Sequence, residues 1–244
     1  MVVRHEEIDF AAGAVVFPGG KLDPGDSDPA LRPRLRGADG LDDLQIALRV
    51  GAIREIFEEC GMLLAYSAGT NDFIGPERVS DLLETYRKPI EHGEVTMAEF
   101  TEREDLELGC GNLVHFAHWI TPAARPKRFD THFYMAIAPE NQIAAHDGRE
   151  AVDSLWITPG QALAEYEAGT RTVIFPTRLN LEKLGRSRSS AAAMDVAGSS
   201  DVVTVLPQVS KTADGRVIQI PKEAGYAGHE FDFDLIANEN RIKS

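Results

Sequence analysis

The sequence is poor in cysteine, in positive charge and in long apolar segments, and each shortage excludes a class of protein. Two cysteines in 244 residues, Cys60 and Cys110, are too few for a disulfide framework. No run of about 18 apolar residues occurs, which argues against a membrane-spanning helix. The opening residues lack a secretory signal pattern, so we expect a cytoplasmic protein with no membrane partner.

Acidic residues outnumber basic ones by 39 to 25, which gives a formal net charge of −14. A chain this acidic is not expected to bind nucleic acid. An anionic ligand would need local positive charge, for which Arg125, Lys127 and Arg128 form one cluster and Arg4 stands apart. For any one of these cations, an ordinary solvated base is the simpler interpretation. With 43% hydrophobic residues, the length suits one large domain with insertions.

An acidic helix is the most informative feature of the chain. The segment from Arg54 to Met62 sets three carboxylates on a predicted helix that Gly61 ends. At about 3.6 residues per turn, one apolar stripe consists of Ile53, Ile56, Phe57 and Cys60, and the opposite side carries Glu55, Glu58 and Glu59. Like charges this close repel, which a divalent cation would reverse, and all-oxygen ligands favour Mg²⁺ or Mn²⁺ over zinc. The alternative is a solvated acidic face without a metal.

A glycine turn and an acidic loop, from Phe17 to Asp26, precede this helix. The two pieces together resemble the Nudix hydrolase signature, which has a glycine, five residues, a glutamate, seven residues, and then Arg-Glu-aliphatic-x-Glu-Glu-x-Gly-aliphatic. The matching positions are Gly20, Arg54, Glu55, Glu58, Glu59, Gly61 and Met62. Other stretches similar to the family are 10–20, 118–133 and 150–156.

Two departures from the signature stand out. Asp26 replaces its glutamate, which shortens the arm of that carboxylate. Ser27 to Ile53 is 27 residues where the signature has seven, so an insertion occupies about residues 27–50. We expect a polar loop followed by an amphipathic extension of the catalytic helix, with Leu41, Leu44 and Leu48 buried. A long insertion at this point resembles the branch containing Nudix-type motif 19 proteins, which are associated with coenzyme A diphosphatase activity.

The resemblance implies an α+β architecture, namely the Nudix fold. It is an α/β/α sandwich with a mixed β-sheet and a catalytic loop-helix over residues 1–185, and residues 186–244 form a C-terminal extension packed on the same domain. We expect strands at 1–3, 14–17, 113–120, 131–138 and 153–157, and helices at 80–87, 96–106, 161–167 and 177–184. In the tail, 202–209 should pair with 217–220, and this hairpin is a candidate homodimer contact. Family members usually carry an earlier strand, so either the start is trimmed or the sheet loses part of an edge.

The resemblance also implies metal-dependent hydrolysis of a diphosphate linkage in a small nucleoside diphosphate derivative. It assigns the metal to Glu55, Glu58 and Glu59. Catalytic roles fall to Glu55, to Glu58, to Arg54 as the residue that orients a glutamate, and to Glu150 as an alternative general base. Candidate substrate-binding residues are Gly19, Gly20, Arg4, Lys127 and Arg128.

Three alternatives for function remain open. The long insertion and the segment from Arg4 to Gly20, which precedes it in the chain, favour coenzyme A or acyl-coenzyme A. The signature handles only the diphosphate, so ADP-ribose, a nucleotide sugar or a dinucleotide would serve equally. A catalytically inactive binding module on a Nudix scaffold is a third interpretation, favoured by Asp26 but opposed by the intact acid cluster.

Two groups of residues are assigned no chemistry. His115, His118 and His132 lack metal-like spacing, so we expect packed or hydrogen-bonded side chains. Cys110, between two glycines, is expected to be a small packed residue and not a nucleophile.

Overall fold

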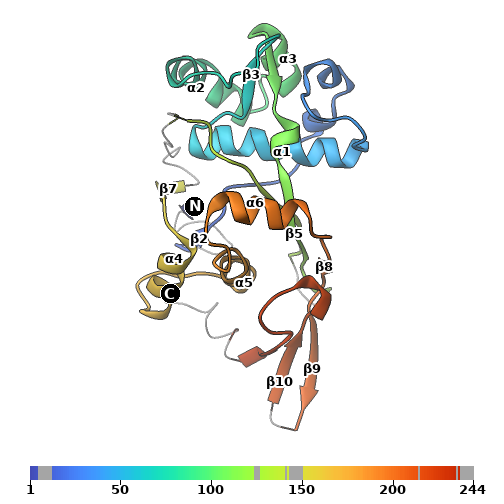
Figure 1. The fold of residues 1–244 in the computed structure, drawn as a ribbon, viewed down its shortest axis with the longest axis vertical. Coiled ribbons are helices and arrows are strands. Elements are labelled where there is room, and N and C mark those ends of the chain that lie inside the picture. Colours follow the sequence, from blue (N-terminus) through green and yellow to red (C-terminus); the bar gives the residue numbers. More distant parts are fainter. Residues whose placement is uncertain are drawn as a thin grey trace.

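Helix α1 (Asp43–Cys60) runs across the upper half of the molecule (Figure 1). The structure is a computed structural model that describes residues 1–4, 13–123, 127–140, 142, 151–213, 215–234 and 236. Helix α1 begins at a capping box in which Asp42 and Gln45 each accept the other's backbone N–H. It ends at Gly61, whose φ of 65° is left-handed and favours glycine. The insertion therefore leads into the catalytic helix, as predicted.

The buried face of α1 differs from the one predicted for the insertion. Its buried apolar residues are spaced at four, three and four positions, as on one side of a straight helix: Ile46, Val50, Ile53 and Phe57. Leu44 is 59% exposed, and Leu41 and Leu48 are only partly buried. The expected burial of Leu44 was wrong. Because α1 is one continuous helix, the burial of Ile53 and Phe57 determines which side of its first turns faces the core, and Leu44 lies on another side.

A helical layer packs on α1 and shares its core (Figure 1). Its elements are α2 (Pro76–Glu91), α3 (Met97–Arg103), the paired strands β3 (Ala65–Ser67) and β4 (Leu106–Leu108), and the short 3₁₀ helices η1 (Pro24–Ser27), η2 (Pro29–Arg34) and η3 (Cys110–Asn112). Both helices were predicted, and Thr96 and Glu99 form the expected capping box of α3. The strands and 3₁₀ helices were not predicted, because they are too short to show periodicity.

Two sheets lie beside this layer. In one, β1 (Val2–Arg4) pairs antiparallel with both β2 (Val15–Val16) and β7 (Ala151–Ser154). In the other, β5 (Val114–Ile120) pairs antiparallel with β6 (Asp130–Met135) and parallel with β8 (Thr204–Val205). The combination of helices with mixed strand pairing agrees with the predicted α+β class.

The C-terminal third adds helices and a projecting sheet (Figure 1). The elements are α4 (Pro159–Glu167), α5 (Phe175–Leu184), α6 (Ser190–Gly198), β9 (Gln208–Thr212), β10 (Gly215–Gln219), η4 (Lys222–Ala224) and β11 (Glu230–Asp232). A core that includes Trp119 and Phe175 also contains Ile218 and Ile220, so the extension packs on β5 and α5.

The tail hairpin pairs differently from the prediction. The strand facing β10 begins at Gln208, and the expected partner 202–209 is instead divided between β8 and β9. Thr204 and Val205 pair with β5 instead, and this pairing buries Val205 almost fully. Among the described residues, no helix is both long and apolar enough to cross a bilayer.

Candidate active site

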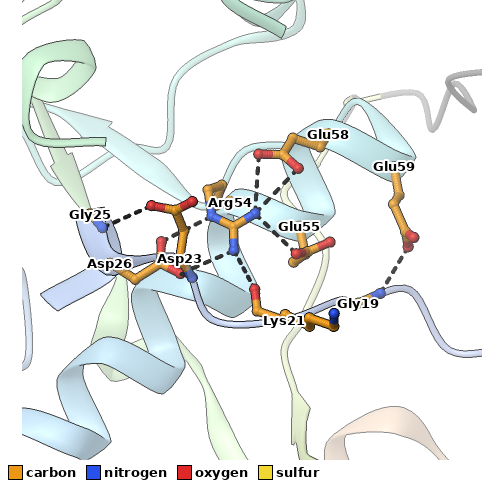
Figure 2. A network of polar contacts seen from close by, with 9 residues as sticks. All are labelled: Gly19, Lys21, Asp23, Gly25, Asp26, Arg54, Glu55, Glu58 and Glu59. Atoms are coloured by element: carbon orange, nitrogen blue, oxygen red, sulfur yellow. Dashed lines mark hydrogen bonds and ion pairs between the residues drawn. The ribbon is translucent and has the colours of Figure 1, made fainter. Parts of the chain in front are cut away.

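Arg54 is the centre of a buried polar cluster where α1 meets the glycine loop (Figure 2). Its Nε and Nη2 donate to Asp26 Oδ1 and Oδ2 at 2.9 and 3.0 Å, which makes a two-pronged pair. Its Nη1 donates to Glu55 Oε1 at 3.0 Å and to Glu58 Oε1 at 3.2 Å. Nη2 also donates to the backbone carbonyl of Lys21 at 2.8 Å. One guanidinium thus joins the helix, the loop and η1.

Asp26 is 1% exposed and is fully engaged in this network. Its Oδ2 accepts the backbone N–H of Asp23 at 2.8 Å, which caps η1. Helix α1 approaches closely here, because a Cβ on Gly51 would lie 3.0 Å from that same Oδ2. The shortened acid at the signature's glutamate position therefore fits the space and holds Arg54.

Glu55 and Glu59 lie against two consecutive glycines of the loop, and Figure 2 shows the contact of Glu59 with Gly19. A Cβ on Gly20 would stand 2.4 Å from Glu55 Oε1, so the carboxylate can take this place only beside a glycine. One turn later, Glu59 Oε2 accepts the backbone N–H of Gly19 at 2.8 Å. Because Gly19 and Gly20 are consecutive, with Cα atoms about 3.8 Å apart, both carboxylates border the same short stretch of backbone.

The charges of the cluster do not balance. Burial acts to lower the pKa of Arg54, but the hydrogen bond and charge of Asp26, with Glu55 and Glu58, raise it above its ordinary value, so the guanidinium stays charged. Burial raises the pKa of Glu58 against the opposing effect of Arg54, and Asp26 and Glu91 add to the rise. One cation thus faces several carboxylates, which leaves a site that attracts further positive charge.

The donor set fits a hard divalent cation. Glu55, Glu58 and Glu59 offer only carboxylate oxygens, which Mg²⁺ and Mn²⁺ prefer. Glu55 and Glu58 point to Arg54 and Glu59 points to Gly19, so a cation held by all three must share their oxygens with these donors (Figure 2). Glu58 accepts from Arg54 Nη1 with both oxygens, at 3.2 and 3.3 Å, and a carboxylate oxygen that accepts one hydrogen bond keeps a lone pair for a cation.

Two of the basic candidates, Lys127 and Arg128, lie outside this cluster. Arg128 is exposed, and its Nε donates to the carbonyl of Thr121 at 3.0 Å, while Lys127 Nζ lies 5.8 Å from the centre of the Phe129 ring. Both residues follow the turn of the β5–β6 hairpin. The hairpin does reach the loop, because the Phe17 and Phe133 rings meet edge to face with centroids 5.9 Å apart. Arg4 ends β1, but its side chain, together with Arg125 and Glu150, lies outside the described residues.

A second polar cluster was not predicted from the sequence. His118, Asp130 and His132 hold ligand atoms that all lie within 4.8 Å of one another. His132 Nδ1 lies 3.1 Å from Nε2 of His115, whose pKa burial and the neighbouring histidines lower to about 4. The expected hydrogen bonds are confirmed, but the grouping was hidden because the residues come from different strands. Cys110, by contrast, is packed as expected, and burial raises its pKa to about 11.

The family model of the NUDT19 Nudix domain matches residues 34–184, which is more than half of the chain. The chain belongs to the NUDT19 Nudix domain family. The match begins in the insertion, so the glycine loop lies outside it and is identified by its own residues and by its contacts with α1.

Two curated relatives carry the name acyl-coenzyme A diphosphatase NUDT19. The protein from Xenopus laevis is 25% identical over 206 residues, covering 69% of this chain and 54% of that relative. The protein from Gallus gallus is 25% identical over 138 residues, covering 51% and 36%. The chain therefore spans about half the length of these relatives or less.

The crystal structure of a NUDIX hydrolase from Alicyclobacillus acidocaldarius is similar in fold, with a TM-score of 0.63 at 26% identity. The similarity covers 80% of this chain and 86% of that one. The predicted Nudix fold is thereby confirmed.

We expect Asp26→Asn to lower the free energy of unfolding by about 3 kcal/mol, because it leaves a buried guanidinium without its two-pronged partner. The value is at the low end for a broken buried pair, since Glu55 and Glu58 remain. Denaturant unfolding measures the loss. Asp43→Asn is the matched control, because its ion pair with Arg32 is exposed and should matter far less. Equal losses in both variants would contradict the central role of Asp26.

Proposed function

We propose that this chain is a Nudix diphosphohydrolase that splits the diphosphate of coenzyme A or an acyl-coenzyme A. The observation that carries the proposal is the placement of Glu55 and Glu59 beside the consecutive glycines of the loop, with Arg54 fixing the cluster. The substrate is supported by the names of the Xenopus and Gallus relatives and by the long insertion.

The residues of the cluster divide the work of hydrolysis. Glu55, Glu58 and Glu59 would hold Mg²⁺ or Mn²⁺, which would supply positive charge for the diphosphate and lower the pKa of a water. Arg54 orients Glu55 and Glu58 and makes no contact with substrate. Gly19 and Gly20, having no side chains, let the diphosphate approach the loop backbone. Glu58 takes the proton of the attacking water, with Glu150 as the alternative base.

Two other functions differ in their support. ADP-ribose, a nucleotide sugar or a dinucleotide would present the same diphosphate to the cluster, so they remain alternative substrates. A binding module without turnover was favoured only by Asp26. The pairing of Asp26 with Arg54 gives that aspartate a structural reason, which supports an enzyme.

The unit that acts is proposed to be residues 1–185, with 186–244 as an extension on the same domain. The family match ending at residue 184 supports this division. The partner is a small molecule and neither nucleic acid nor a membrane, in line with the net charge of −14. The hairpin of β9 and β10 is the candidate contact of a homodimer.

Product analysis by mass spectrometry tests the substrate. The purified chain is incubated with Mg²⁺ or Mn²⁺ and a panel of coenzyme A, acyl-coenzyme A, ADP-ribose, NADH and nucleotide sugars. Cleavage of coenzyme A into 3′-phosphoadenosine 5′-phosphate and phosphopantetheine is expected. Turnover of ADP-ribose or a nucleotide sugar alone would exclude the coenzyme A assignment but keep the enzyme class.

Glu59→Gln is expected to lower kcat by about 100-fold or more, because it removes one carboxylate charge from the site. The amide oxygen can still accept the Gly19 N–H, so the melting temperature should stay equal or rise as helix repulsion is relieved. Glu84→Gln on the exposed face of α2 is the matched control. Near-normal turnover in Glu59→Gln would refute the assignment.

Gly20→Ala separates placement of Glu55 from its charge. The added methyl would overlap the end of the Glu55 side chain, which can swing away, so the fold should persist while kcat falls. Gly160→Ala is the control, because nothing lies within 4 Å of its Cβ position. Steady-state kinetics and thermal unfolding give the two readouts. Unchanged kcat in Gly20→Ala would show that Glu55 need not lie beside the loop.

Arg128→Ala tests recognition of the 3′-phosphate of coenzyme A. We expect it to weaken coenzyme A by about 1–3 kcal/mol, the usual worth of a charge-assisted contact, and dephospho-coenzyme A by much less. The ratio of kcat/KM for the two substrates is the measurement. Arg103→Ala, which removes an exposed cation of α3, is the control. Equal losses on both substrates would assign the 3′-phosphate to another cation.

A further inference from the structure

A bulge in β5 places three histidines on one face of the β5–β6 hairpin. Side chains alternate along a regular strand, so His115 and His118, three residues apart, would face opposite sides. The register shifts between His115 and Ala117. Before the shift His115 pairs with Tyr134, and after it His118 pairs with His132. Tyr134 and His132 are two residues apart and share a face, so both histidines of β5 share it too.

Asp130 completes the group on the same face. It lies two residues before His132 and pairs with Ile120, which is two residues after His118. Its Oδ1 lies 2.5 Å from His118 Nε2 and 3.7 Å from His132 Nε2. The two imidazole rings stack with centroids 3.9 Å apart and planes 13° from parallel. The three ligand atoms lie within 4.8 Å of one another, and because the rings are stacked, at least one imidazole must rotate for both Nε2 atoms to bind one ion.

The other nitrogen of each ring is already occupied. His118 Nδ1 lies 2.8 Å from Thr204 Oγ1 on β8, and His132 Nδ1 lies 3.1 Å from His115 Nε2. Thr204 Oγ1 and His115 Nε2 can each accept a proton held on Nδ1, and in that tautomer Nε2 can bind a cation in place of the proton that His118 otherwise donates to Asp130. A hydrogen bond to the second nitrogen is the usual support of a metal-ligating histidine.

We propose that His118, His132 and Asp130 form a second metal site, which binds a divalent transition-metal ion of the zinc type. Two imidazoles and one carboxylate make a borderline donor set that suits Zn²⁺, unlike the all-oxygen glutamates of α1. Ligands on a tetrahedral zinc at about 2.0–2.1 Å lie roughly 3.4 Å apart, so the 3.7 Å between Asp130 and His132 suits an ion, whereas the 2.5 Å between Asp130 and His118 must lengthen. His115 and Thr204 act as positioning residues.

The shape of the site agrees with an ion open to solvent on one side. The two imidazoles are 14% and 18% exposed, whereas the Asp130 side chain is 64% exposed. Asp130 can therefore move back by about an ångström to admit a cation between itself and His118. The two histidines come from the paired strands β5 and β6, and the more exposed Asp130 is the first residue of β6.

Zinc binding to the full-length chain tests the proposal. Isothermal titration with Zn²⁺ is carried out in excess Mg²⁺, which occupies the oxygen ligands of α1. One Zn²⁺ per chain and a rise in melting temperature are expected. His118→Gln and His132→Gln should each abolish this binding. Thr204→Val and His115→Gln, which touch only the supports, should weaken it by about 10–100-fold. His92→Gln, a histidine at the end of α2, is the control and should bind normally.

Failure here is distinguishable from failure of the proposed hydrolase. Glu59→Gln should lose turnover and keep zinc binding, whereas His132→Gln should lose zinc binding and keep its fold by circular dichroism. Absence of stoichiometric zinc binding in the unaltered chain would overturn the proposal, and so would full binding by both histidine variants. Loss of zinc only in Glu59→Gln would place the ion on α1 and also overturn it. If His118→Gln does not fold, Thr204→Val is the deciding variant, because it leaves all three ligands in place. Unweakened zinc binding by Thr204→Val would then overturn the proposal.

Discussion

The buried pair of Arg54 and Asp26 is the constraint on which the rest of the site depends. A buried ion pair seldom adds much net stability, because the cost of removing two charges from water offsets their attraction. What it supplies here is position. Arg54 also binds the Lys21 carbonyl, Glu55 and Glu58, so η1, the glycine loop and α1 cannot shift independently. The close approach at Gly51 leaves Asp26 enough room and little more.

The insertion is held against the domain by contacts at several points and is not a loose loop. Leu31 is 1% exposed within the core beneath α3, and Arg36 bonds both Glu107 and the Thr70 carbonyl. The capping box at Asp42 then starts α1 more than two turns before Glu55. The insertion thus ends in helix α1. Asp26 and Arg54 are therefore in direct contact although the insertion separates them along the chain.

Sequence reasoning succeeded where the information is local. The acid cluster, the Gly61 end of α1 and the Thr96 capping box are each specified by residues a few positions apart. Predictions from the sequence failed where residues distant in the chain determine which side of an element is buried or which side chains meet. Leu44 looked like part of an apolar stripe, but the phase set by Ile53 and Phe57 turns it to solvent. The histidine cluster depends on a bulge near Phe116 and on cross-strand register, neither of which the spacing of His115 and His118 reveals.

The electrostatics of the site determine what the proposed diphosphate substrate would need. Arg54 pairs with Glu55 and Glu58 (Figure 2), and its donors are spent on Asp26, Glu55, Glu58 and the Lys21 carbonyl, so it has none to offer a phosphate. One positive and four negative side chains, counting Glu59, leave the cluster at about −3 when all are ionised. A single divalent ion leaves it still negative. Binding a diphosphate would therefore require more than one divalent ion, or added cations from outside the cluster, because Arg54 is committed to holding the carboxylates and the loop in place.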